Sequence, residues 1–158
     1  MFKLCFIFLI IPFVAQTQHI SVEQAAFDYF AIKVFAQNYP DIKRVYYSGE
    51  TEREETIVGP FGDCFQSDSK FQEFFKEKHE VVSEKIDIES ANVMKFKKSS
   101  KSHPRQLNLM IYRGVRQNEI MYVYMKIYKE MHFADHYLIK IQAASRQVLE
   151  VCRTNEIM

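Results

Sequence analysis

Apolar residues recur at helical spacing in the segment that begins at Ser21. Pairs of apolar residues repeat every four positions from Ala26 to Phe35, which gives one wide stripe along a helix. Ser21 followed by Gln24 has the spacing of a capping box, so the helix is expected to begin there. The turn-forming residues 38–40 predict its end. A helix with one apolar stripe must pack on another layer, and a sheet is the expected partner.

A second, shorter helix is predicted over residues 67–79, with Ser67 or Asp68 as its cap. Two short strands are predicted before it, at 42–49 and 55–58. A polar turn separates these strands, and the breaker cluster GPFGDC follows them. The apolar side of the second helix carries Phe71, Phe74 and Phe75.

Alternation of apolar and polar residues predicts strands throughout the chain after Glu80. The alternation changes parity near Ser90, which predicts one long strand bent by a bulge over residues 81–98. Two further strands meet at a hairpin turn in the sequence RGVRQN. A last hairpin turns at residues 143–146.

Strands that follow one another in hairpins form an antiparallel sheet, and the predicted helices lie toward the front of the chain. The sequence therefore predicts an α+β fold. We expect a curved antiparallel sheet of about five to seven strands, with two helices packed on one face.

The predicted strand Ile120–Tyr128 is apolar or aromatic on both of its sides. One side alternates from Met121 to Ile127 and can face the helices. A strand covered on one side only should carry polar residues on the other side. Tyrosines there indicate a pocket or a surface that another chain covers, although cross-strand aromatic pairs that only stabilise the sheet are an alternative. The candidate ligand-binding residues are Tyr112, Tyr122, Tyr124, Tyr128 and Tyr137.

The first eighteen residues have the layout of a secretory signal peptide, in which Lys3 precedes the apolar run Leu4–Ala15. This run is shorter than the roughly 20 residues that cross a bilayer as a helix, so we expect it to be removed and to leave no membrane anchor. Residues 19–158 then form a single α+β domain that is secreted or periplasmic.

Charge gives no indication of a nucleic-acid partner. The sequence has 21 basic and 20 acidic residues, so removal of Lys3 with the signal peptide makes the two numbers equal. Basic and acidic residues also alternate along the chain, which leaves no excess of positive charge for a nucleic acid. One basic cluster surrounds the Ser-rich segment 99–102, which we interpret as the solvated tip of a hairpin rather than as a polyanion contact. Its members are Lys95, Lys97, Lys98, Lys101 and Arg105.

Two cysteines, Cys64 and Cys152, remain after the predicted cleavage. An oxidising compartment would allow them to form a disulfide, which would stabilise the fold by about 4 kcal/mol in the chain-entropy model. Alternatively, both are small buried apolar residues that do not meet. The sequence alone leaves both interpretations open.

The best candidates for chemistry are His132, Asp135 and His136 in the sequence EMHFADHY. Two histidines four residues apart can bind a metal with Asp135 as a third ligand, but the HExxH spacing is absent. We interpret these three residues as solvent-facing turn residues. The chain also lacks a GxSxG elbow and a glycine-rich phosphate loop, so neither a metal nor another cofactor is predicted.

The order of predicted elements resembles the NTF2-like and cystatin-like α+β folds over residues 20–153. In these folds a curved sheet wraps helices around a cone-shaped cavity. The final segment HYLIKIQAASRQVLEV also resembles the closing hairpin of small secreted bacterial domains without an assigned role. The resemblance implies a pocket but not a reaction, because one fold hosts many functions.

Two functions follow as hypotheses. The first is an exported, non-enzymatic binding domain that uses the tyrosine-bearing face for a small apolar ligand or a partner protein, including a second copy of itself. The second is a small NTF2-like hydrolase or isomerase in which Asp135 or His136 is the base and a tyrosine donates a hydrogen bond.

Overall fold

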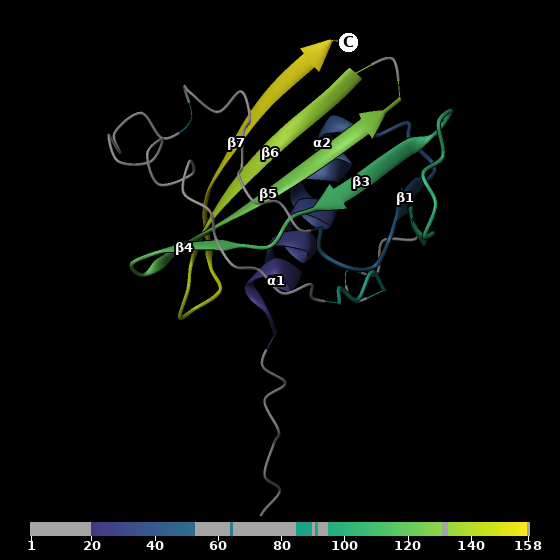
Figure 1. Ribbon diagram of the computed structural model, residues 1–158. Coiled ribbons are helices and arrows are strands. Elements are labelled where there is room, and N and C mark those ends of the chain that lie inside the picture. Colours follow the sequence, from purple (N-terminus) through teal and green to yellow (C-terminus); the bar gives the residue numbers. More distant parts are fainter. Residues whose placement is uncertain are drawn as a thin grey trace, which may run out of the picture.

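The computed structural model describes residues 20–52, 64, 85–89, 91, 95–130 and 133–157. The predicted signal peptide, the strand predicted at 55–58 and the helix predicted at 67–79 lie outside these residues. Within them, one helix lies across one face of an open, seven-stranded mixed sheet (Figure 1). The predicted α+β class is confirmed, but the described ranges contain one helix, not two.

The helix has three consecutive segments, which are α1 (Val22–Tyr29), the π-helical η1 (Phe30–Phe35) and α2 (Ala36–Asn38). Ser21 is the cap, as predicted, and its hydroxyl accepts a hydrogen bond from the backbone N–H of Gln24 at 3.0 Å. A π turn closes after five residues, which brings the rings of Phe30 and Phe35 to 6.3 Å and buries both. Of the helices in the described ranges, none is long and apolar enough to cross a membrane.

Seven strands form the sheet, in the order β2-β1-β3-β5-β6-β7, with β4 paired to β5. Their bounds are β1 (Val45–Tyr47), β2 (Phe96–Lys98), β3 (Leu107–Ile111), β4 (Val115–Gln117), β5 (Ile120–Lys129), β6 (Phe133–Gln142) and β7 (Val148–Ile157). Strands β3, β5, β6 and β7 are antiparallel neighbours, as expected. The last hairpin also turns where it was predicted, between β6 and β7.

The prediction of an antiparallel sheet is wrong at one end, because β1 is parallel to both β2 and β3. Parallel neighbours need a connection of a dozen or more residues, and the chain between β1 and β2 is long enough to provide one. Since β1 lies between β2 and β3, the Ser-rich segment 99–102 is not the tip of a hairpin. It belongs to a connection between two strands that do not pair with each other.

Two strand boundaries also differ from the prediction. Residues 86–89 are not in a strand, and the only strand in the described part of 81–98 is β2. The sequence RGVRQN contains β4, so the tight turn lies at Asn118–Glu119, where Asn118 takes a positive φ of 55°. Alternation predicts that a segment can be extended, but pairing partners decide which part of it joins a sheet.

The two sides of β5 are both buried, each in a separate cluster. Val123, Met125 and Ile127 pack under the helix and are fully buried. Tyr122 and Tyr124 point to the opposite face, as the alternation predicted, and lie in a second apolar cluster. The other members of that cluster are Cys64, Val115 and Leu138, with Tyr112, Ile120 and Cys152 at its border.

The start of the helix is fixed to the sheet by a buried carboxylate. Glu23 lies in the first turn of α1, where a negative charge is favoured by the helix dipole. Its Oε1 accepts a hydrogen bond from the backbone N–H of Gly114 at 2.9 Å and pairs with Arg113 Nε at 3.2 Å. This contact sets the position of α1 over the connection between β3 and β4.

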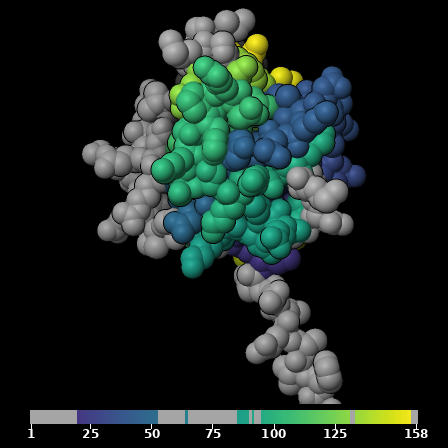
Figure 2. Space-filling view, turned by 90° about the vertical axis from the view of Figure 1, so that its right-hand side faces the viewer, coloured from purple at the N-terminus to yellow at the C-terminus, as the bar shows by residue number. Residues whose placement is uncertain are grey.

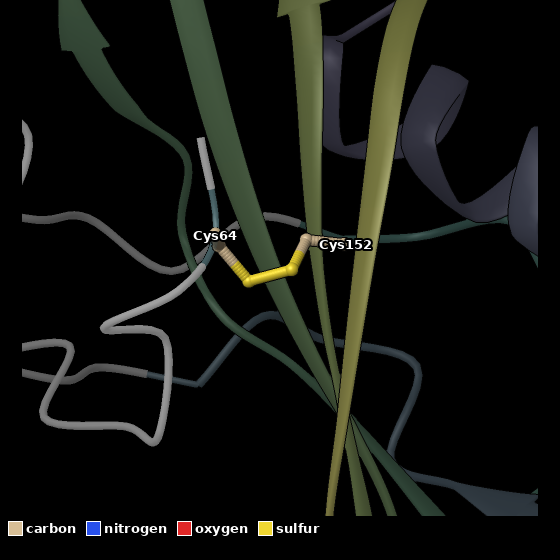
Figure 3. The surroundings of a disulfide bond; sticks show 2 residues. All are labelled: Cys64 and Cys152. Carbon is tan, nitrogen blue, oxygen red and sulfur yellow. A yellow bond between two sulfur atoms is a disulfide. The ribbon is translucent and has the colours of Figure 1, made fainter. Parts of the chain in front are cut away.

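A disulfide joins Cys64 to Cys152 on β7 (Figure 3). Their Cα atoms are 5.7 Å apart, within the usual range for a bridged pair. The bond closes a loop of 88 residues in sequence. It holds Cys64 against the sheet face that carries Tyr122 and Tyr124, on the side opposite the helix.

Replacing both cysteines with serine should lower the free energy of unfolding by about 4 kcal/mol, because the unfolded chain regains the freedom that the closed loop removes. Urea unfolding, followed by tyrosine fluorescence, measures the difference. A reductant should destabilise the wild type but leave the Cys64→Ser/Cys152→Ser variant unchanged. If the wild type without reductant and the Cys64→Ser/Cys152→Ser variant have equal free energies of unfolding, the contribution assigned to the disulfide is wrong.

Candidate functional site

Asp135 and His136 lie in the middle of a strand and not in a turn. Both belong to β6 and both are buried, so their interpretation as solvent-facing turn residues is wrong. Strands β5 and β6 pair in register from Ile120 with Gln142 to Lys129 with Phe133, which confines the turn to the residues after Lys129. His132 lies outside the described residues.

Asp135 is the centre of a polar network on the helix side of the sheet. Its Oδ2 accepts hydrogen bonds from the hydroxyl of Tyr39 and from Arg153 Nη2, the latter at 3.1 Å. The hydroxyls of Tyr39 and Tyr137 are 2.9 Å apart. Since Tyr39 gives its single proton to Asp135, Tyr137 must donate to the Tyr39 oxygen. Arg153 Nη1 also donates to Asn38 Oδ1 at 2.6 Å, so the network joins the end of the helix to β6 and β7.

The surroundings of this network keep its tyrosines protonated. Burial raises the pKa of Tyr39 far above its ordinary value, and the hydrogen bonds with Asp135 and Tyr137 raise it further. Burial also raises the pKa of Tyr137. The guanidinium of Arg153 lies over both rings, 5.9 Å from the centroid of Tyr39 and 5.7 Å from that of Tyr137. This is the arrangement of a satisfied buried carboxylate, in which each hydroxyl already has a partner.

His136 faces the other side of the sheet. Its Nδ1 is 2.7 Å from the hydroxyl of Tyr124, and the ring of Tyr124 stacks on that of Tyr112 at 4.5 Å. Neighbouring residues of a strand point to opposite faces. The carboxylate of Asp135 and the imidazole of His136 are therefore separated by the sheet and do not form one acid–base pair.

The five candidate tyrosines do not share one open face. Tyr122 and Tyr124 are only 1% and 4% exposed, so neither ring is accessible to a ligand in this arrangement. Tyr112 and Tyr128 are half-buried on the same face. The prediction that Tyr137 shares this face is wrong, because Tyr137 is paired in register with Met125 and packs against Phe30 on the helix side.

A small polar hollow adjoins Tyr128 and the Ser-rich segment 99–102. Its volume is about 100 Å³, below the range typical of ligand pockets. Figure 2 shows this side of the molecule, where β2 and the residues after it lie next to β1. Within the basic cluster, Lys95 donates to the carbonyl of Pro40 at 3.1 Å, while Lys97, Lys98, Lys101 and Arg105 are exposed.

A second and larger hollow is a groove between the outer surface of the helix and the turn that joins β6 to β7. Its volume is about 640 Å³, and its lining is mainly apolar. Three large apolar side chains line it although they are exposed, namely Ile20 (53%), Tyr29 (38%) and Ile32 (48%). The remaining lining residues are Ala25, Asp28, Lys33, Ala144, Ser145, Arg146 and Val148.

Sequence reasoning missed this groove, although a signal for it was present. Tyr29 and Ile32 lie outside the apolar stripe that packs on the sheet. The outer face of an amphipathic helix normally carries polar residues, so large apolar residues there are a signal of a binding surface. The π-helical turn contains Ile32 and Lys33, and π turns inside α-helices are frequently found at functional sites.

Metal binding finds no support among the residues in the described ranges. No group of three or more His, Cys, Asp or Glu side chains in that part of the chain could hold a metal ion.

The network predicts a specific loss of stability at alkaline pH. A tyrosine whose pKa is raised by folding contributes stability that is present below the ordinary pKa of about 10 and is lost as the pH rises above it, by up to about 1.4 kcal/mol per pH unit. The Tyr39→Phe variant should be less stable than the wild type at pH 8, because Asp135 loses a hydrogen bond. Its stability should then fall less steeply above pH 10, as urea unfolding across this range would measure.

The Tyr29→Phe variant is the control for this measurement, because Tyr29 is exposed and outside the network. It should keep the alkaline slope of the wild type. The same slope in Tyr39→Phe as in Tyr29→Phe would contradict the role assigned to the Tyr39 hydroxyl.

Comparisons of this chain with protein-family models, with curated proteins and with solved structures gave no match. Its candidate site is therefore defined by its own geometry.

Proposed function

We propose that this chain is an exported, non-enzymatic binding domain that holds an apolar partner in the groove between the helix and the β6–β7 turn. The observation that carries the proposal is the exposure of Ile20, Tyr29 and Ile32 around one groove. Exposed apolar side chains are common singly, but a contiguous group around a hollow indicates a binding surface. The volume of about 640 Å³ lies within the range of ligand sites.

Two features support export. The apolar run Leu4–Ala15 has the length and the flanking residues of a signal peptide. The disulfide between Cys64 and Cys152 belongs to the oxidising environment outside the cytosol.

The groove is a better candidate than the sheet face that carries the tyrosines. Tyr122 and Tyr124 are already buried in a cluster with Cys64, so a partner would have to displace part of the chain to reach them. The groove needs no such displacement. The enzymatic hypothesis needs Asp135 or His136 to project into a cavity beside a tyrosine. Both side chains are buried, and neither lines the groove or the small polar hollow.

Binding of Nile red, a neutral apolar dye, tests this function. Dilute wild-type protein should bind the dye with an increase in fluorescence. Ile32→Gln should weaken binding about tenfold, because it removes exposed apolar surface from the lining of the groove. Fluorescence titration gives both affinities, and circular dichroism confirms that the variant keeps its fold.

Leu149→Gln provides a matched control, since Leu149 is also a large apolar side chain, 47% exposed, but does not line the groove. Its affinity for the dye should equal that of the wild type. If dilute wild-type protein does not bind the dye, or if the two variants bind it equally, the groove is not the binding site.

A further inference from the structure

The exposed surface of the helix is complementary to itself. Asp28 and Lys33 carry opposite charges and both line the groove, and Tyr29 and Ile32 lie between them in sequence. Both pairs are centred on the same point, between Phe30 and Ala31. Ala25 and Ala36 form a third pair about this point, one on each side.

A two-fold axis through this point would bring an antiparallel copy of the helix into register. Asp28 of one copy would then lie opposite Lys33 of the other, and Tyr29 opposite Ile32, each twice by symmetry. A two-fold interface uses the same patch on both subunits, so a patch must be complementary to itself to form one. The small side chains of Ala25 and Ala36 would allow the two helices to approach closely at both ends of the contact.

Local contacts hold Asp28 and the two walls of this groove in place. Gln24 Nε2 donates to Asp28 Oδ1 at 2.9 Å, which orients the carboxylate along the helix. On the other wall, Arg146 Nε donates to the carbonyl of Ile20 at 3.2 Å, which ties the β6–β7 turn to the start of the helix. The groove is thus bounded by two elements that are fixed to each other.

We infer that the partner held in this groove is a second copy of the chain, which packs its α1–η1 surface antiparallel against the first in a two-fold symmetric dimer. The inference rests on the proposed function of the groove and names its occupant. Charge complementarity favours a second copy over a purely apolar ligand, because an apolar ligand would leave Lys33 without an opposing charge from the bound molecule.

Sedimentation velocity over a wide range of protein concentration tests the dimer. The wild type should convert from monomer to dimer as its concentration rises. Lys33→Asp places like charges opposite each other twice, and it should raise the dimer dissociation constant about tenfold or more. Lys43→Asp makes the same change of net charge at an exposed site outside the groove, and it should dimerise like the wild type.

A mixing experiment identifies the register of the contact. Lys33→Asp alone has acidic residues at both positions, and Asp28→Lys alone has basic residues at both. Each variant should be mainly monomeric by itself, but an equimolar mixture should form a heterodimer, because each acidic position then faces a basic one. A mixture that stays monomeric at concentrations where the wild type dimerises would overturn the proposed register.

The outcomes separate this inference from the proposed function. A wild type that binds Nile red when dilute but remains monomeric at every concentration overturns the second copy as the partner and leaves the groove as a binding site for another apolar partner. The inference is also overturned if the wild type dimerises and the Lys33→Asp variant has the same dimer dissociation constant as the Lys43→Asp variant. If dimerisation is accompanied by loss of dye fluorescence per molecule, the copy occupies the groove and the inference is supported.

Discussion

The middle of strand β5 is buried on both of its faces, and the rest of the structure depends on how each face is covered. Apolar residues alternate with tyrosines along β5, so neither face can be left in water without exposing large rings or aliphatic side chains. The helix covers one face with its phenylalanine stripe. On the other face, a disulfide holds Cys64 in the cluster of Tyr122, Tyr124 and Leu138. With both faces of β5 covered, the large apolar side chains that stay exposed on the helix are Tyr29 and Ile32, on its outer side.

Successive side chains of a strand point to opposite faces of the sheet, and this separates Asp135 from His136 on β6. Asp135 and His136 are neighbours in sequence, yet one joins the network of Tyr39 and Arg153 and the other contacts Tyr124 on the opposite face. Asp135 and the Nδ1 atom of His136 each have a hydrogen-bond partner on their own side of the sheet. The two groups act in the structure as separate anchors, one for the end of the helix and one for the second apolar cluster.

The π turn gives the helix one side that is buried in the core and one side that is exposed. Closing after five residues, it places both Phe30 and Phe35 in the core and leaves Ile32 and Lys33 on the outer surface. The position of the outer surface is set from both ends, by Glu23 on the β3–β4 connection and by Tyr39 on Asp135. A groove with fixed walls can bind a partner without a large loss of conformational freedom.

The sequence by itself determined the elements whose cause is local. The cap at Ser21, the apolar stripe that follows it, the alternation in β5 and the last hairpin depend on spacing and turn chemistry, and each is found where it was predicted. Only the tertiary structure decided the parallel placement of β1, the π turn, the meeting of Cys64 with Cys152 and the burial of Asp135 and His136. These features depend on contacts between residues far apart in the chain, such as Tyr39 with Asp135, and local spacing carries no information about which distant partners will meet.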